Sequence, residues 1–456
     1  MIISESLPGI KTFLQPLRWP DARRAMLLRL MVGFIVHCGK MSTSQAAGSI
    51  YTQARHRANV GRYLARRHSV DAMTLNRLER RIIRSQLRRK GQWFFDVDQT
   101  YIGHQGQHTE NTFSRANYRP RARSSQRHQK KWARRSCHGF VMGMLITPSG
   151  CRIPFFKSYL TDVYCRKHGH VYRTQTELAA ELIRELPLPP ETCVTVLGDT
   201  AFDAKIIRAA CAARGFDWIV PANPERVLEG PPKQRPKVSS LIGHLKASAL
   251  VPVRLVPGKG PHAAQHRVAR CRSESRTQAR TFYVHGERRQ VRNVGDVLLV
   301  FSTKEKPASN QAVKIQKVLM ASCTSWSPRR VVQSYDLRWQ IELMFKELKS
   351  TLGLDHYQIR EFRKVERYVA ACLVTFLYLE WYRLQRLASR SICKQERLRC
   401  SSQRTYGICR LVRQRAEAND LAHIARSCRT KTGLRRLRRQ LEHAIPLEYQ
   451  TKRPGC

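Results

Sequence analysis

Residues 334–354 read SYDLRWQIELMFKELKSTLGL, and successive members of the set Tyr335, Arg338, Glu342 and Lys349 are three, four and seven residues apart. On an α-helix, which turns by about 100° per residue, these four side chains fall within an arc of roughly 60°. One helical stripe therefore presents a carboxylate, two cations and a phenol to the same place. Such a stripe is unsuited to a buried core face, and its groups are those that handle a phosphate beside a metal ion.

The composition of the chain points to a polyanionic partner. The 456 residues include 83 Lys and Arg against 33 Asp and Glu, a net charge of +50. Self-repulsion of this size destabilises a compact chain unless a polyanion screens it. We therefore expect nucleic acid as the partner. The alternative is a generally basic protein such as a ribosome-associated factor.

Membrane and disulfide signals are both missing from the sequence. The longest apolar run, 369–379, is shorter than the roughly 18 residues that a membrane span needs, and it predicts a core helix. None of the 14 cysteines forms a C-x-x-C pair, so neither a zinc site nor a disulfide framework is indicated. We expect a cytoplasmic, nucleoid-associated protein with reduced thiols and no membrane contact.

The pattern along the chain predicts an α/β fold in five regions. Residues 1–90 are expected to form a helical DNA-binding domain, with helices at 21–37 and after Asp71, although an Arg-rich solvated face is the alternative. Residues 91–223 read as β-β-β-α-β-α-β, a mixed sheet with flanking helices. Residues 224–322 read as a β-rich insertion with strands near 250–257, 280–292, 296–304 and 313–321. Residues 323–389 would complete the α/β core with helices 328–352 and 362–388. The basic region 390–456 could clasp DNA, dimerise or lack order.

Three separated acids are the candidate catalytic residues. Asp98 lies in DVDQT on the first expected strand, Asp199 ends a later strand in GDTAFDA, and Glu342 lies on the stripe. Two or three carboxylates that converge can hold a pair of Mg²⁺ ions for phosphoryl displacement. Each acid alone has a simpler explanation: Asp98 as a polar strand end, Asp199 as a helix N-cap, and Glu342 as a surface partner of Lys346.

With these motifs in place, the chain resembles a DDE transposase of the insertion sequence four family. The family signature Y-x-x-R-x-x-x-E-x-x-x-x-x-x-K is met without a departure in spacing by the residues of the stripe. The second-acid motif resembles Asp199 followed by Ala201 and Phe202, and the first-acid motif resembles Asp98 followed by Thr100. The resemblance covers roughly 92–380 and includes a β-rich insertion between the second and third acids.

The resemblance implies a ribonuclease-H-like fold and a role for each signature residue. Asp98, Asp199 and Glu342 would be catalytic metal ligands for Mg²⁺, with Mn²⁺ as a substitute. Tyr335, Arg338 and Lys349 would contact DNA phosphate near the cleavage point. Asp96 faces the same side of its strand as Asp98 and is the alternative first acid, but the spacing to Thr100 favours Asp98.

Several aromatic residues and histidines outside the signature have more than one interpretation. Trp339 lies about 100° from the stripe, and we interpret it as core rather than a DNA contact. A stacking aromatic that holds a flipped base is expected in the insertion of some relatives, and either Phe282 or Tyr283 could serve, although both fit a strand core equally well. The histidine pairs 104/108, 168/170 and 262/266 lack further ligands, so we interpret them as loop or DNA-facing residues. No P-loop is present, and ATP dependence is not expected.

The sequence thus predicts a transposase of an insertion element. It would bind double-stranded DNA at terminal inverted repeats, hydrolyse a phosphodiester there to free a 3′-OH, and transfer that end into target DNA. It would act as a homodimer, because two ends have to be held together. Two alternatives stay open: another ribonuclease-H-like DNA endonuclease, and a non-catalytic DNA-binding protein descended from a transposase.

Overall fold

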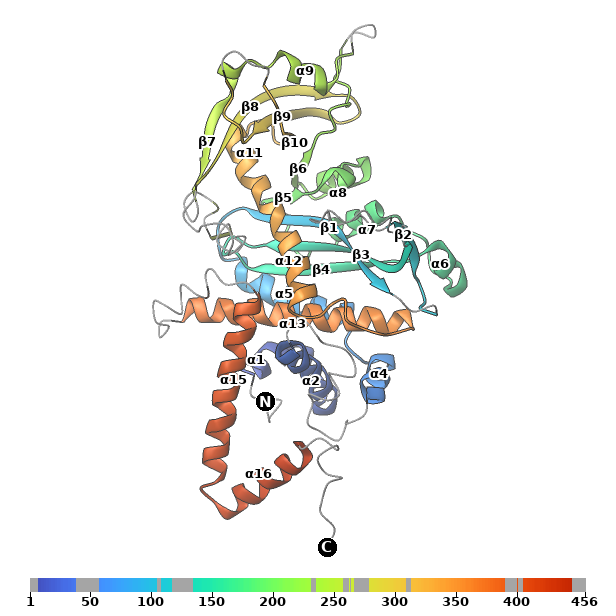
Figure 1. Ribbon diagram of the computed structural model, residues 1–456, viewed down its shortest axis with the longest axis vertical. Coiled ribbons are helices and arrows are strands. Elements are labelled where there is room, and N and C mark those ends of the chain that lie inside the picture. The colour runs from blue at the N-terminus through green and yellow to red at the C-terminus, as the bar shows by residue number, and fades with distance from the viewer. Residues whose placement is uncertain are drawn as a thin grey trace, which may run out of the picture.

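The computed structural model describes residues 7–37, 57–104, 108–116, 134–230, 235–256, 262, 264–265, 279–308, 313–389, 400 and 405–444. Within these ranges the chain forms a mixed α/β structure around one ten-stranded sheet, with helices at its N-terminal and C-terminal ends (Figure 1). The expected mixed sheet with flanking helices is confirmed. Most of the cationic segment 115–135 lies outside the described residues.

The N-terminal region is helical, as expected. Its elements are α1 (Ile10–Leu14), η2 (Gln15–Leu17), α2 (Asp21–His37), α4 (Arg57–Ala65) and α5 (Ala72–Gln86). Asp71 caps α5, because its carboxylate accepts a hydrogen bond of 2.8 Å from the backbone N–H of Thr74. The apolar stripe of α5, which includes Leu75, Leu78 and Ile82, is buried, and α5 packs against the long helix α13 (Phe362–Ala388).

The first half of the sheet follows the predicted order of elements. Strands β1 (Trp93–His104), β3 (Arg134–Ile146) and β4 (Arg152–Tyr159) are antiparallel, and β5 (Val194–Leu197) and β6 (Asp217–Pro221) continue the sheet parallel to β1. The spatial order is β4-β3-β1-β5-β6. Helices α7 (Gln175–Arg184), η3 (Thr200–Phe202) and α8 (Lys205–Ala213) connect the later strands. Two short elements were not foreseen, β2 (Phe113–Ala116) and α6 (Asp162–His168).

Strands from the second half of the chain extend the same sheet. All four strands expected between 224 and 322 are present, as β7 (Val251–Leu255), β8 (Arg280–Val291), β9 (Gly295–Thr303) and β10 (Lys317–Ala321). Strand β10 pairs with both β9 and the core strand β6, so the added strands do not form a separate sheet. The β8–β9 turn places Asn293 and Gly295 at φ values of 63° and 97°, a region that glycine adopts without strain. Helices α9 (Val238–His244) and η4 (Ala247–Ala249) precede β7.

The signature segment forms a broken helix across the sheet. The expected helix 328–352 is divided into α11 (Pro328–Tyr335), η5 (Asp336–Arg338) and α12 (Trp339–Ser350). Helix α11 packs against β6 and β8–β10, and α12 packs on β1 (Figure 1). Alternate side chains of β1 face opposite ways, since Val97 lines a cavity together with Phe202 and Ile207 whereas Asp98 meets η5. The α11–α12 segment and the η3–α8 segment therefore cover opposite faces of the sheet.

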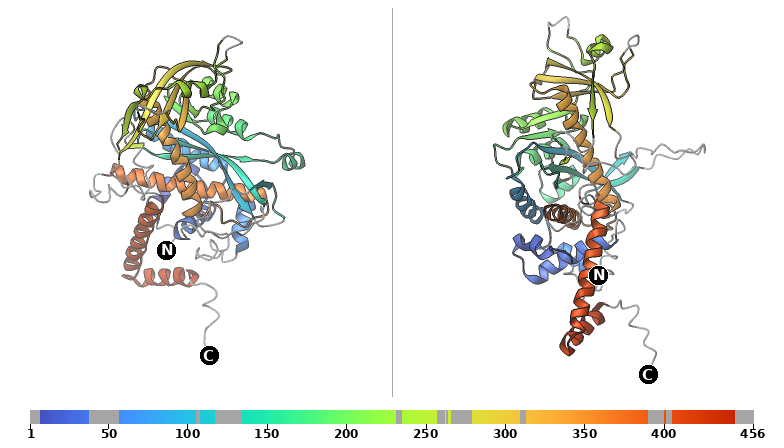
Figure 2. Two further views of the ribbon diagram at one scale, coloured as in Figure 1. Left: turned by 45° about the horizontal axis from the view of Figure 1, so that its top comes forward. Right: turned by 90° about the vertical axis from the view of Figure 1, so that its left-hand side faces the viewer.

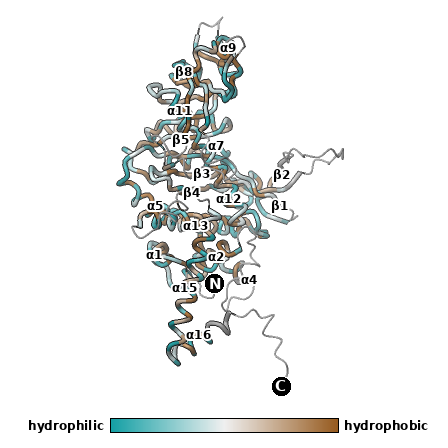
Figure 3. Tube along the Cα trace, turned by 60° about the vertical axis from the view of Figure 1, so that its left-hand side comes forward, coloured by the Kyte–Doolittle hydropathy of each residue, from teal (hydrophilic) through white to brown (hydrophobic). Residues whose placement is uncertain are grey.

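The C-terminal region contains two helices beyond α13. Helix α15 (Thr405–Ser427) leads away from the sheet, and α16 (Lys431–Ala444) turns off its far end (Figures 1 and 2). The most apolar stretches lie in the interior strands and in α13, whose residues 368–379 are all buried (Figure 3). Among the described residues, no helix combines the length and the apolar character that crossing a membrane requires.

Candidate active site

Two of the predicted acids lie at the same level on neighbouring parallel strands. Asp96 of β1 is in register with Leu197 of β5, so two residues further along each strand the chain reaches Asp98 and Asp199. Asp98 is still within β1, whereas Asp199 is the residue before η3. Sheet register, rather than proximity in sequence, therefore brings these two carboxylates together.

Arg338 joins all three acids. Its Nη2 lies 2.7 Å from Oδ2 of Asp98 and 3.8 Å from Oδ2 of Asp199, and its Nη1 lies 3.4 Å from Oε1 of Glu342. The Asp98 side chain is only 7% exposed, whereas those of Asp199 and Glu342 are 36% and 38% exposed. The cluster is thus closed on the sheet side and open to solvent on the other, as a site for a large polyanion must be.

The simpler explanations of the acids are partly correct and compatible with the cluster. Asp199 does cap the following turn, because its Oδ1 accepts a 2.9 Å hydrogen bond from the N–H of Ala201, while its second oxygen faces Arg338. Glu342 faces Arg338 four residues before it on the helical segment, and the alternative pairing with Lys346 is not among the ion pairs of the described residues.

The two candidate first acids have different surroundings. Asp96 is fully buried, and neither of its carboxylate oxygens has a hydrogen-bond partner within the described structure. Burial raises the pKa of Asp96 well above its usual range, and Arg338 opposes the rise. Burial also raises the pKa of Asp98, to about 7, against the opposing effect of Arg338. Asp98 is the one that contacts Arg338 directly, which favours it over Asp96 as the first acid of the cluster.

Tyr335 and Lys349 are tethered at the two ends of the stripe. The Tyr335 hydroxyl donates a 3.2 Å hydrogen bond to the carbonyl of Gly198, the residue before Asp199. The Lys349 ammonium donates a 3.0 Å hydrogen bond to the carbonyl of Tyr101 on β1, and burial lowers its pKa. The four signature residues therefore all point toward the C-terminal ends of β1 and β5, despite the η5 turn within the helix.

The η5 turn is also held by an ion pair with β8. Asp336 pairs with Arg280 of β8, with 2.6 Å between Oδ2 and Nη2. Together with the Tyr335 hydrogen bond, this pair holds the N-terminal end of the turn that carries Arg338. A 3₁₀ turn inside a longer helical segment is often associated with a functional site.

A cation near the cluster was missed by the sequence analysis. The Lys317 ammonium, at the start of β10, lies 5.0 Å from the centroid of the Tyr335 ring. Partial burial lowers its pKa, and the positive charges of Arg338 and Lys304 lower it further. No ion pair to Lys317 occurs within the described parts of the chain. Because Lys317 belongs to no local motif, only the structure shows that it lies near Tyr335.

The aromatic residues and the histidines outside the signature differ in their exposure. Trp339 was interpreted as core, and this is wrong: its side chain is 59% exposed beside Arg338. Phe282 and Tyr283 are both partly buried on β8, and Phe282 has Arg280 and Lys304 each 6.0 Å from its ring centroid. His262 is buried and contacts Gln265 at 3.1 Å, so it is neither a loop surface residue nor DNA-facing. His266 lies outside the described residues.

The donor set fits a hard divalent cation, although it is not arranged as a ready metal site. Three carboxylates offer the oxygen ligands that Mg²⁺ prefers. Within the described residues, no group of three or more His, Cys, Asp or Glu side chains is arranged to hold a metal ion. The reason is visible in the geometry, since the guanidinium of Arg338 lies between the three acids.

Comparison with models of known protein families matches residues 89–378 to the family described as Transposase DDE domain. The matched span is more than half of the chain, and it contains the three acids, Arg338 and Lys349. A search among curated proteins gave no match.

Proposed function

We propose that this chain, which belongs to the transposase DDE domain family, is the transposase of an insertion element, and that Asp98, Asp199 and Glu342 are its catalytic acids. Membership of the family implies DNA cleavage and strand transfer of the transposase type. The observation that carries the assignment of the acids is their convergence on one guanidinium from β1, from the end of β5 and from α12.

Asp98, Asp199 and Glu342 would hold the Mg²⁺ ions, with Mn²⁺ as a substitute. When bound, such ions supply a stronger nucleophilic oxygen and stabilise charge on the leaving oxygen. Since Arg338 lies between the acids in this structure, its guanidinium would have to move toward the DNA phosphate if these carboxylates held a cation. Charge repulsion between cations drives that movement.

The cations of the site are proposed to bind the DNA backbone around the scissile ester. Arg338 would form paired hydrogen bonds to a phosphate through its planar fork of donors, whereas Lys349 would act as a point charge. Tyr335 would keep the Gly198–Asp199 turn in place and contribute its hydroxyl at the edge of the site.

Trp339 is exposed beside Arg338 and is available to contact DNA. Lys317 would bind a neighbouring phosphate, because it is a cation flanked by other cations.

The reaction would proceed in two displacements at phosphorus. Water attacks the phosphodiester at the element end and frees a 3′-OH, and that hydroxyl then attacks target DNA. Arg338 and Lys349 offset the negative charge that grows on the phosphate oxygens in each transition state. Two element ends have to be held together for the second step, which favours a homodimer, and the net charge of +50 favours association with the nucleoid.

The finer family and fold assignments rest on specific patterns. The unbroken spacing of Tyr335, Arg338, Glu342 and Lys349 supports membership of the insertion sequence four group. The strand order β4-β3-β1-β5-β6, with two parallel strands added to an antiparallel set, supports a ribonuclease-H-like core. We propose that this core comprises 91–223 and 323–389, with the strands of 224–322 added at its β6 edge and the regions 1–90 and 390–456 flanking it.

A strand-transfer assay tests the proposed function. The full-length protein is incubated with a supercoiled plasmid that carries its gene together with the flanking DNA, with Mg²⁺ or with EDTA. The proposal predicts Mg²⁺-dependent breaks at the two ends of an inverted repeat, with free 3′-OH groups, and joining of these ends to a second plasmid. Cleavage without joining would instead favour another nuclease of the same fold. Binding without cleavage would favour a non-catalytic descendant.

A further inference from the structure

A buried ionic network lies on the side of α12 away from the acids. Arg152, the first residue of β4, is 1% exposed, and its Nη1 lies 2.8 Å from Oε2 of Glu347 on α12. Its Nη2 lies 2.9 Å from Oε1 of Glu380 on α13. Arg383 completes the network, since its Nη2 lies 2.8 Å from Oε2 of Glu380 and donates a 2.6 Å hydrogen bond to the carbonyl of Gly150. Two cations and two carboxylates therefore balance in the interior.

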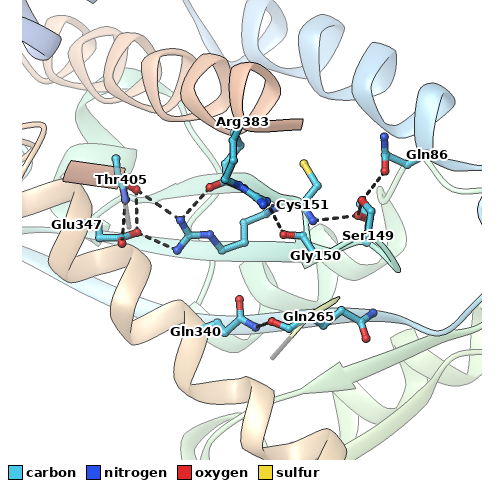
Figure 4. A network of polar contacts seen from close by, with 12 residues as sticks. Gln86, Ser149, Gly150, Cys151, Gln265, Gln340, Glu347, Arg383 and Thr405 are labelled. Atoms are coloured by element: carbon cyan, nitrogen blue, oxygen red, sulfur yellow. Dashed lines mark hydrogen bonds and ion pairs between the residues drawn. The ribbon is translucent and has the colours of Figure 1, made fainter. Parts of the chain in front are cut away.

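The C-terminal region enters this network through the first residue of α15. Thr405, at the start of α15, donates its hydroxyl to Oε2 of Glu347 at 2.8 Å and its backbone N–H to Oε1 at 3.2 Å. Figure 4 shows Thr405 and Glu347 facing each other, with Arg383 and Gly150 at the other end of the network. Glu347 thus accepts hydrogen bonds from both the sheet and α15, and α12 is tied to each of them.

The position of Glu347 on α12 connects this network with the acids. Glu347 follows Glu342 by five residues, which places the two side chains about 140° apart around the helix. Glu342 faces Arg338 above β1, and Glu347 faces Arg152 of β4 and Thr405 of α15. A rotation or sliding of α12 would therefore break the Glu347 contacts and move Glu342 at the same time.

Energetics suggest why charged groups occupy this place. Replacing a buried ion pair with apolar residues of similar volume is often neutral or stabilising, so net stability is a weak reason for the network. Apolar packing has little directional preference, whereas hydrogen bonds between charged groups fix distance and angle. A network of this kind suits a helix whose orientation matters more than its contribution to folding.

We propose that Arg152 and Glu347 are positioning residues for the reaction, and that Thr405 makes the C-terminal helix α15 part of the same positioning unit. This inference rests on the proposed function, because it concerns the placement of Glu342 and Arg338. A misplacement of about 1 Å from a distant change can lower a rate by about 100-fold. Helix α15 would therefore influence catalysis through Thr405, which contacts Glu347 on α12.

The test uses full-length variants that keep the interior charges balanced. Arg152→Met combined with Glu347→Gln removes one cation and one anion and leaves the Glu380–Arg383 pair. Thr405→Val removes one hydroxyl and keeps the shape of the side chain. Matched controls are Glu79→Gln, which replaces a buried carboxyl group on α5, and Thr375→Val, whose buried hydroxyl donates a hydrogen bond to the carbonyl of Ala371 in its own helix.

Three measurements are compared across these variants: melting temperature, kcat and KM for plasmid cleavage with Mg²⁺, and hydrogen exchange of the α12 amides. The double variant should lower kcat by about 10–100-fold, the range for losing a residue that orients a metal ligand, with KM within about twofold. Thr405→Val should lower kcat by about fivefold, as for one lost hydrogen bond. Exchange in α12 should accelerate in both, and the controls should change neither kcat nor that exchange.

Two results would overturn the positioning role. One is an unchanged kcat with unchanged α12 exchange in both network variants. The other is a loss of activity that only follows the unfolded fraction given by the melting curves. If the unaltered protein itself fails to cleave DNA, the proposed function fails, whereas the exchange data still decide whether Arg152 and Thr405 hold α12.

Discussion

Asp98 and Arg338 lie 240 residues apart in the chain, and their side chains form an ion pair with 2.7 Å between Oδ2 and Nη2. The pair joins β1, an interior strand of the sheet, to the turn between α11 and α12. Because Asp199 and Glu342 face the same guanidinium, Arg338 offsets the repulsion among three carboxylates that sheet register and helix packing bring together. The roles of the acids and of Arg338 can therefore be tested separately.

Asp199→Asn should abolish cleavage while DNA binding is retained. The amide keeps an oxygen that can cap η3 but loses the charge that a divalent cation needs, so kcat should fall by at least about 10²–10³-fold. DNA affinity, measured by fluorescence anisotropy, should stay within about twofold because many other cations bind the backbone.

The matched control for this variant is Asp203→Asn. Asp203 lies four residues further on, with a side chain 4% exposed, and forms ion pairs with Arg208 and Arg226. Its loss should lower the free energy of unfolding by about 3 kcal/mol and leave kcat per folded molecule nearly unchanged. Equal nicking by Asp199→Asn and by the unaltered protein would remove Asp199 from the site.

Lys317→Ala should weaken DNA binding, because one contact between the protein and a DNA phosphate is lost. Each neutralised phosphate adds about −0.9 to the slope of log affinity against log salt, so the slope should become shallower by about that amount. Lys317→Arg should restore it. The control is Lys237→Ala, since Lys237 is an exposed lysine already paired with Glu225 at 2.7 Å. An identical salt slope in the Lys317 and Lys237 variants would contradict a phosphate contact at Lys317.

The buried network should make stability fall in acid. Burial raises the pKa of Glu380, but Arg383 and Arg152 overcome that effect and lower it to about 2, from its usual 4.5. Because the folded-state pKa is the lower one, Glu380 stabilises the fold above its unfolded-state pKa, and this stabilisation is lost as pH falls from about 4.5 toward about 2. Urea unfolding at several values of pH should show a steeper loss in the unaltered protein than in Glu380→Gln. Parallel curves for the two proteins would mean that Glu380 is not the group responsible.

The sequence predicted those elements whose signal is local. Strand β5 is a short apolar run that ends at Asp199, and α5 begins at a capping Asp71. Both patterns depend on neighbours in the chain, and both were correct. The convergence of Asp98, Asp199 and Glu342 was reached from chemical need and from the resemblance, because no local pattern encodes the register between β1 and β5.

Features that depend on tertiary packing were not predictable in the same way. The helical period continues through 328–352, so nothing in the spacing of residues indicates the turn at Asp336–Arg338. Trp339 was misjudged because periodicity gives its direction relative to the stripe but not what covers that side. Arg152 and Thr405 contact Glu347 from positions 195 and 58 residues away, and a single sequence offers no sign of such contacts.

Arg338→Ala should change metal binding and cleavage in opposite directions. Removing the guanidinium removes a positive charge from among three carboxylates, so Mn²⁺ should bind more tightly, by about tenfold or more for a unit charge a few ångströms away. Cleavage should nevertheless fall by at least about 100-fold, since the phosphate loses its main electrostatic stabiliser. Free Mn²⁺ measured by electron paramagnetic resonance and kcat for plasmid cleavage report the two effects independently. Arg338→Lys keeps the charge and should bind Mn²⁺ like the unaltered protein. Weaker Mn²⁺ binding in Arg338→Ala would show that the guanidinium orients the acids for the metal rather than competing with it.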